Sequence, residues 1–191
     1  MSEKLTDGEK QILLRLAREA MEHGVRGKKV PPLDPNSLPP ALHDDGASFV
    51  TLTIDDDLRG CIGALEAVQP LAEDVREHAV AAALQDPRFP TVEESELSRI
   101  RIEVSRLTAP VPLEYTTGED LLKKLRPGID GVILRDGYRR ATFLPQVWEK
   151  IPQPAEFLDH LCRKMGVNQS LWRKGTLQVL IYQVEEFHEL N

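Results

Sequence analysis

Cys61 is the residue of this sequence whose type and setting most suggest chemistry. It lies in the hexapeptide Leu58–Gly63, Leu-Arg-Gly-Cys-Ile-Gly, with a glycine before it and another two residues after it. A thiolate is a strong nucleophile and redox group, but only a few per cent of a free cysteine is ionised at neutral pH, given a reference pKa of about 8.5. A reactive Cys61 would therefore need an activating neighbour. The alternative is a thiol that packs as a small buried hydrophobe, and both remain open.

Two arginines are candidates for binding an anion beside this thiol. Arg59 lies in the hexapeptide, and Arg88 lies in the rigid turn Asp86–Pro90. A guanidinium presents a planar fork of donors that suits carboxylates and phosphates. Adjacent strand residues point to opposite faces, so Arg59 does not meet the thiol unless a bulge intervenes. Arg88 could instead pair with Asp86 and hold the turn together.

A catalytic thiol also requires a group that carries a proton. Glu103, on the polar side of a predicted strand, is one candidate, and the five histidines are others. His78 and His160 are the pair to test first, although neither sits in a recognisable Cys-His signature. The predicted catalytic residues are Cys61 and Glu103, and the predicted binding residues are Arg59, Gly60, Ile62, Gly63 and Arg88.

The pattern of cysteines and glycines argues against a bound metal or nucleotide. Cys61 and Cys162 are the two cysteines, and no CxxC pair, metal-ligand motif, phosphate-binding loop or dinucleotide fingerprint occurs. Cys162 falls on the apolar face of a predicted helix, which favours a core position. We therefore predict neither a metal nor a cofactor, and reduced thiols.

Composition narrows the class of protein further. The 191 residues are 41% hydrophobic and 29% charged, which is ordinary for a globular domain, and the formal net charge is -7. Nucleic acids and anionic membranes attract cationic surfaces, so the sequence predicts neither partner. There is no apolar run of signal-peptide or membrane-spanning length, which predicts a soluble, cytoplasmic protein.

The hexapeptide should form the second strand of a hairpin. A β-branched and aromatic strand over 48–54 precedes it, and the aspartates of 55–57 supply the turn. Glycine in a strand gives no packing, so Gly60 and Gly63 predict a bulge or a close approach of backbone to something else. That neighbour could be a ligand, a partner or another part of the chain.

The remaining elements alternate between helical and strand patterns. A capping box at Thr6–Glu9 opens a helix that ends near Gly24, and a proline-rich segment over 30–40 should run extended over the surface. Further predicted helices begin at Pro70, Gly118, Pro145 and Pro154, and further predicted strands cover 100–107, 131–135, 139–144 and 177–184. The prediction is an α/β (α+β) fold with a mixed, largely antiparallel sheet flanked by helices.

Several motifs together resemble those of one family. They are 48–52, the hexapeptide 58–63, Pro70-Leu71 with Asp74-Val75, the turn 86–90, Glu103-Val104-Ser105, Pro127–Gly131 and Ala141–Trp148. In this order they are similar to the AMMECR domain, known in prokaryotes as AmmeMemoRadiSam system protein A. The resemblance runs from about Leu5 to Phe187. It implies one domain over 1–191 with a larger lobe that carries the hexapeptide and a smaller lobe.

The resemblance also implies partners, but no established activity. Proteins of this kind occur beside a Memo-like protein and a radical S-adenosylmethionine enzyme. One hypothesis is therefore a binding or adaptor component with a small-molecule or peptide pocket near the hexapeptide. The other is an enzyme that uses Cys61 as a nucleophile or redox thiol. The first predicts that replacing Arg59 weakens association while replacing Cys61 does not.

Overall fold

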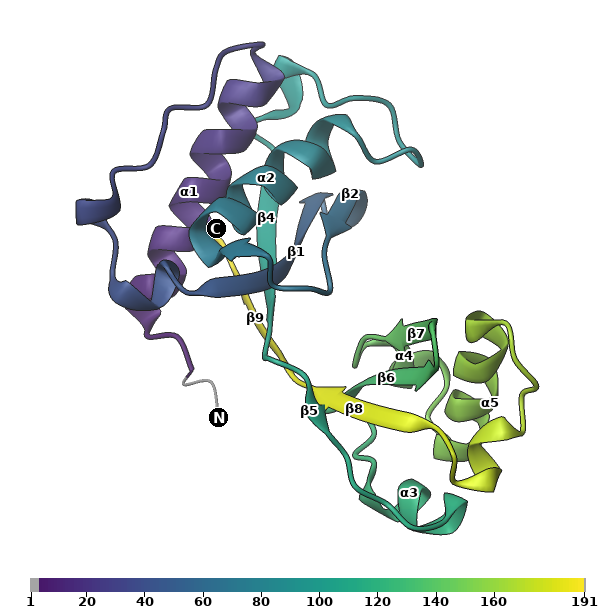
Figure 1. The fold of residues 1–191 in the computed structure, drawn as a ribbon. Coiled ribbons are helices and arrows are strands. Elements are labelled where there is room, and N and C mark those ends of the chain that lie inside the picture. Colours follow the sequence, from purple (N-terminus) through teal and green to yellow (C-terminus); the bar gives the residue numbers. More distant parts are fainter. Residues whose placement is uncertain (1–3, 191) are drawn as a thin grey trace. The chain divides into compact units, whose positions relative to one another are not determined.

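A computed structural model of the chain describes residues 4–190, which divide into two compact units. Unit 1 takes the described residues up to Thr108 and those from Glu185 onward, and unit 2 is Ala109–Val184. The two units are described separately below, and their elements are labelled in Figure 1.

Unit 1 combines two long helices with an antiparallel sheet. The helices are α1 (Asp7–Val25) and α2 (Leu71–Leu84), with 3-10 turns at Pro35–Ser37, Pro40–Leu42 and Glu94–Glu96. The strands are β1 (Asp45–Ile54), β2 (Asp57–Gly63), β3 (Gln69–Pro70), β4 (Ile100–Leu107) and β9 (Val184–His188). Their order is β2-β1-β4-β9, and β3 pairs with the beginning of β1.

Both helices of unit 1 pack on one face of this sheet. Val50, Leu52, Ile102 and Val104 are fully buried there, in one cluster with apolar residues of α1 and α2. Figure 1 shows α1 and α2 side by side over β1 and β4. Successive strand residues alternate between faces, so Phe49, Thr51 and Thr53 belong to the opposite face. We call that opposite face the outer face.

The start of α1 follows the sequence prediction, and its end differs slightly. The Thr6 side chain accepts from the backbone N–H of Glu9, and the Glu9 carboxylate accepts from the backbone N–H of Thr6, which completes the capping box. The helix continues past Gly24 to Val25, and the chain turns at Gly27, whose φ is +63°. Glycine takes that left-handed conformation without steric cost.

The proline-rich segment also differs in part from its prediction. Pro35 and Pro40 each open a 3-10 turn rather than leaving the segment wholly extended. A proline suits the first position of such a turn because the missing N–H would have no partner there. Arg76 of α2 donates to the carbonyl of Pro31, which ties the segment to the helix.

Unit 2 is a second, smaller sheet-and-helix assembly. Its strands are β5 (Val111–Pro112), β6 (Gly131–Asp136), β7 (Arg139–Phe143) and β8 (Gln178–Tyr182), in the order β5-β8-β6-β7. Its helices are α3 (Gly118–Lys124), α4 (Val147–Lys150) and α5 (Pro154–Met165), with a 3-10 turn at Leu171–Lys174. The β6–β7 hairpin predicted at Asp136-Gly137 is present.

The core of unit 2 explains two motifs that the sequence alone left without a role. Asp130 is fully buried and accepts hydrogen bonds from the backbone and guanidinium of Arg126. Its carbonyl accepts from the indole of Trp148, whose ring stacks on Phe157 with centroids 3.6 Å apart. These residues hold a loop and a helix in place, so their role is structural.

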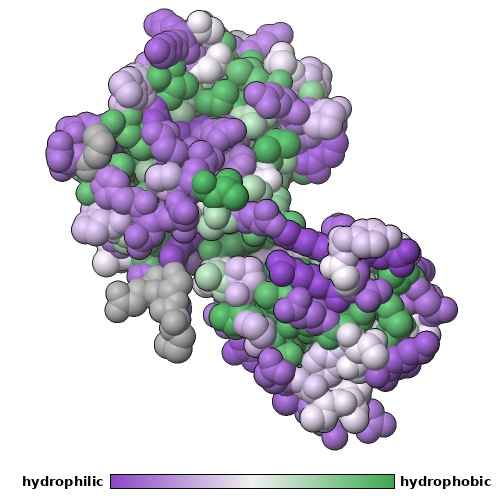
Figure 2. Space-filling view, in the orientation of Figure 1, coloured by the Kyte–Doolittle hydropathy of each residue, from purple (hydrophilic) through white to green (hydrophobic). Residues whose placement is uncertain are grey.

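The mixed α/β class with antiparallel sheets is therefore confirmed. One strand prediction was incomplete, because the segment predicted as a single strand over 177–184 is followed directly by β9, and β8 and β9 belong to different sheets. Figure 2 shows polar and apolar residues interspersed over the visible surface of each unit. Across the described residues, none of the helices combines the length and apolarity that a membrane crossing requires.

Candidate functional site

Three polar side chains form a row across the outer face of the unit 1 sheet. Thr51 on β1 is paired with Cys61 on β2 and with Glu103 on β4, so the three residues follow one another across neighbouring strands. Directly opposed side chains share a face and lie within contact distance. The Thr51 hydroxyl donates to Cys61 Sγ at 3.3 Å. The structure thus places the two residues predicted as catalytic on the same face, two strands apart, with a threonine between them.

A β-bulge sets this arrangement. Leu52 pairs with Gly60 and Thr53 pairs with Leu58, which leaves Arg59 as the extra residue of β2. A bulge shifts the register by one and so reverses which face each later residue occupies. Beyond it, Gly60 and Ile62 join the helix-covered face, while Cys61 and Gly63 join the outer face.

Both glycines are required by close approaches within unit 1. A Cβ on Gly60 would lie 2.1 Å from the backbone oxygen of Ala82 in α2. A Cβ on Gly63 would lie 2.4 Å from the ring of Phe49, the residue paired with it on β1. The close neighbour that the glycines predicted is therefore part of the chain itself. It is helix α2 for Gly60 and strand β1 for Gly63.

Arg59 is held by the loop that follows α2. Its guanidinium donates to the Glu96 carboxylate at 2.8 and 3.0 Å and to the carbonyls of Pro90 and Thr91. The pKa of Glu96 is lowered, chiefly because Arg59 hydrogen-bonds to its ionised form. These contacts fix the hexapeptide to the loop, and none of these four bonds is to Cys61.

Asp86 and Arg88 form hydrogen bonds to the backbone of Cys61 at the free edge of strand β2. The buried Asp86 carboxylate accepts from the backbone N–H of Cys61 at 2.9 Å, and Arg88 donates to the Cys61 carbonyl at 3.3 Å. Arg88 is itself bound to Asp86 through two guanidinium hydrogen bonds of 2.7 and 2.9 Å. The pair thus satisfies the groups that a further strand would use, which protects an edge from unwanted pairing.

The electrostatics of the row are dominated by Glu103. Burial raises the pKa of this carboxyl above its ordinary value because it disfavours the charged form, and repulsion from Glu186 adds to the effect. His188 and Arg101 act in the opposite direction. A carboxyl with a raised pKa can carry a proton closer to neutral pH than an exposed glutamate can.

The histidines singled out in the sequence have other neighbours. His78 lies on α2, where Nδ1 is 3.1 Å from the Asp74 carboxylate, and Ser48 donates to the same carboxylate at 2.6 Å. His160 lies in unit 2 beside Glu156. Within residues 4–190, none of the hydrogen bonds to Cys61 comes from a histidine.

Cys162 matches its prediction as a core residue. It is fully buried on the apolar face of α5, and burial raises the pKa of its thiol. Over the part of the chain that the structure describes, no group of three or more metal-ligating side chains gathers in one place.

Sequence reasoning missed Thr51 and Glu96, while the pairing of Asp86 with Arg88 that it offered as an alternative is present, and only the bond from Asp86 to Cys61 was not foreseen. Asp86 was visible as the first residue of the turn 86–90, and its carboxylate could have been expected to cap a neighbouring backbone group. Thr51 and Glu96 carried no comparable signal, because their positions depend on strand register and on a long-range ion pair.

Comparisons with known proteins agree on one family. Residues 14–187 match the family model described as AMMECR1. A protein of Thermofilum pendens is 39% identical over 203 residues, covering 97% of this chain and 92% of its own length. A protein of Methanopyrus kandleri is also 39% identical, covering 99% of this chain and 92% of its own length.

A solved structure supports the same relationship. The crystal structure of the uncharacterized protein PH0010 from Pyrococcus horikoshii is 34% identical, with a TM-score of 0.82. The match covers 97% of this chain and 93% of that one.

Proposed function

Since the chain belongs to the AMMECR1 family, we propose that it is a binding component of an AmmeMemoRadiSam-type modification system. In this proposal it acts with a Memo-like protein and a radical S-adenosylmethionine enzyme. The outer face around Cys61, Thr51 and Glu103 is the surface that receives the partner or its small-molecule or peptide ligand.

The observation that carries the proposal is that strand β2, which bears Cys61, is held rigidly by its neighbours in unit 1. Gly60 is packed on α2, Arg59 is tied to Glu96, and the Cys61 backbone is held by Asp86 and Arg88. A strand fixed on three sides loses little conformational entropy when it binds, which favours affinity. In this arrangement Arg59, Gly60 and Arg88 hold the strand in position, and the side chains of Thr51 and Glu103 form the contact surface.

The proposal predicts that Glu103 contributes to association. Reversing its charge in Glu103→Arg should weaken binding of the purified partners from the source organism at least about ten-fold, because mismatched interface charges cost several kilocalories per mole and a ten-fold loss needs only about 1.4 kcal/mol. Cys61→Ser should bind as the parent does. Equilibrium dissociation constants from biolayer interferometry would measure this.

Glu19→Arg is the matched control, since it makes the same charge change at an exposed position on α1. Far-UV circular dichroism would confirm that each variant is folded. Equal affinities for Glu103→Arg and Glu19→Arg, or no association of the parent at micromolar concentration, would rule out the outer face as the docking surface.

A second candidate function is catalysis by the thiol. The Thr51 hydroxyl bonded to Cys61 Sγ and the raised pKa of Glu103 favour it. Glu103 lies two strands from Cys61, about 10 Å given strand spacings near 4.8 Å, so a proton could pass between them only through Thr51 or water. The absence of a bonded histidine among the described residues weighs against this reading.

Alkylation separates the two functions. With iodoacetamide at neutral pH, the half-buried Cys61 should react at least about ten times faster than Cys162, whose thiol is fully buried with a raised pKa. Peptide mass spectrometry of timed samples gives both rates in one experiment. An activated thiol would also outpace glutathione, whereas a Cys61 slower than glutathione would exclude the nucleophile.

A further inference from the structure

A cavity in unit 1, separate from the Cys61–Thr51–Glu103 row, carries a concentration of positive charge. It has a volume of about 620 Å³ and lies between α1, the start of β4 and the residues after β9. Four arginines line it, Arg15, Arg18, Arg99 and Arg101, together with Glu189. This is unexpected in a chain whose formal net charge is -7.

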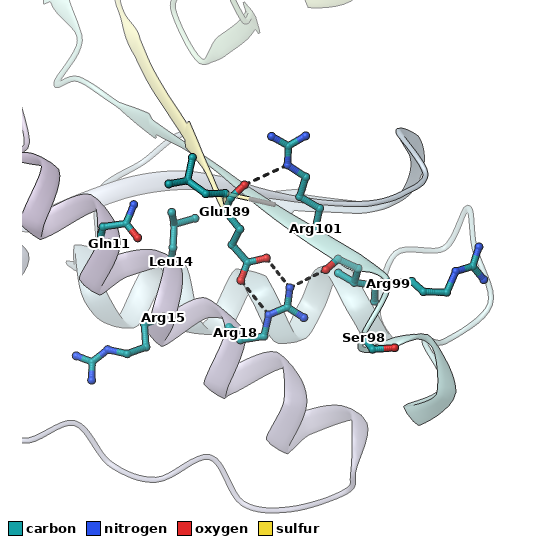
Figure 3. Close-up of a pocket in the computed structure, with 10 residues that line it drawn as sticks. Gln11, Leu14, Arg15, Arg18, Ser98, Arg99, Arg101 and Glu189 are labelled. Carbon is teal, nitrogen blue, oxygen red and sulfur yellow. Dashed lines mark hydrogen bonds and ion pairs between the residues drawn. The ribbon is translucent and has the colours of Figure 1, made fainter.

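Arg18 forms the fixed centre of this arginine pocket. Its guanidinium donates to both oxygens of Glu189 and to the carbonyls of Leu97 and Ile100. Figure 3 shows it in the middle of the lining residues, facing Glu189. These bonds hold α1 to the end of the chain and use most of the donors of Arg18.

The other three arginines form fewer bonds than Arg18, and Arg101 donates through Nε alone to the Glu189 carbonyl at 3.2 Å. Arg15 is exposed and has no ion-pair partner within residues 4–190. Arg99 and Arg101 face Asp55 and Asp56, at 2.6 and 4.0 Å, and these aspartates are 75% and 94% exposed. Ion pairs so open to water are worth little and exchange readily. In Figure 3 the guanidinium groups of Arg15 and Arg99 extend away from the lining, while that of Arg101 is hydrogen-bonded to Glu189.

We propose that the arginine pocket binds a small polyanion through phosphate or carboxylate oxygens, with Arg15 and Arg101 turning inward to form charge-assisted hydrogen bonds. The volume lies within the range of small-molecule sites, and guanidinium forks match such oxygens bidentately. Ser98 and Gln11, which also line the cavity, supply neutral hydrogen-bonding groups. Positive charges that repel one another across the pocket gain from an anion between them.

Titration calorimetry at low salt tests this, with pyrophosphate and citrate as probes. We expect one saturable site per chain, weakened at least ten-fold in the double variant Arg15→Gln/Arg101→Gln. Stronger binding of pyrophosphate assigns the site to phosphates, and stronger binding of citrate assigns it to polycarboxylates. Arg18 is left intact because of its structural bonds.

Arg139→Gln is a single-charge control, at an exposed arginine on strand β7 of unit 2. It should bind the probes as the parent does. The proposal is overturned if neither probe gives a saturable signal, if the double variant binds as tightly as the parent, or if the control loses affinity equally. Thermal unfolding midpoints of all variants would verify that they remain folded.

Discussion

Gly60→Ala should destabilise unit 1 by about 3 kcal/mol, at the upper end of what overpacking costs. The added Cβ would lie 2.1 Å from the Ala82 carbonyl oxygen. That oxygen is part of the helix backbone and cannot rotate away as a side chain can. The helix must therefore shift from the sheet, or the bulged strand must move and carry Cys61 with it.

Gly8→Ala provides the control. Gly8 lies in the first turn of α1, where a Cβ would meet no atom closer than 4.0 Å. Alanine is the better helix former, so this variant should be neutral or more stable by up to about 1 kcal/mol.

Chemical denaturation followed by two probes measures both variants. Trp148 and Trp172, the two tryptophans of the sequence, belong to unit 2, so fluorescence reports on that unit while circular dichroism reports on the whole chain. For Gly60→Ala we expect the circular dichroism transition to move to lower denaturant. A variant with the parent's midpoint would show that α2 does not approach the hexapeptide as closely as the structure places it.

Local sequence patterns predicted the elements of this fold well, because each rests on chemistry within a few residues. The capping box at Thr6, the Asp136-Gly137 hairpin and the alternating strand over 100–107 are all present. The division of the last strand into β8 and β9 could not be predicted. It depends on which sheet each half joins, and that information is not local.

The face of the sheet on which Cys61 lies could not be predicted from the sequence. A hairpin that turns at Asp55-Asp56 without a bulge would set Cys61 opposite Val50, on the face that the helices cover. The bulge at Arg59 moves it opposite Thr51 instead. The glycines pointed to an irregular strand, but the extra residue is fixed by the long-range bonds from Arg59 to Glu96 and to two carbonyls. A single residue of register thus decides whether the thiol is core or surface.

Asp86→Asn should remove about 2–3 kcal/mol of stability at neutral pH. The carboxylate, only 5% exposed, accepts from the backbone N–H groups of Cys61 and Arg88 and from the Arg88 guanidinium. Hydrogen bonds to a charged acceptor are each worth roughly 1.5–3 kcal/mol, and the exposure of Arg88 reduces the ionic share. Urea denaturation of parent and variant at a series of pH values would measure the loss.

The pH dependence follows from the direction of the shift. Arg88 first, and then the two backbone donors, hold the pKa of Asp86 well below its usual range. A group with a depressed folded pKa contributes its stability above the unfolded value, about 3.9, and loses it as the pH falls further. The difference between parent and Asp86→Asn should be constant from pH 7 to about 5 and should shrink below about pH 4.

Asp57→Asn, an exposed aspartate at the start of β2, is the control, and it should change stability by less than about 0.5 kcal/mol. The experiment also bears on Arg88 as a predicted binding residue. A guanidinium committed to Asp86 has few donors left for a ligand. If Asp86→Asn were as stable as the parent at every pH, the bonds of Asp86 to Arg88 and Cys61 would be weak, and Arg88 would be free to bind an anion beside Cys61.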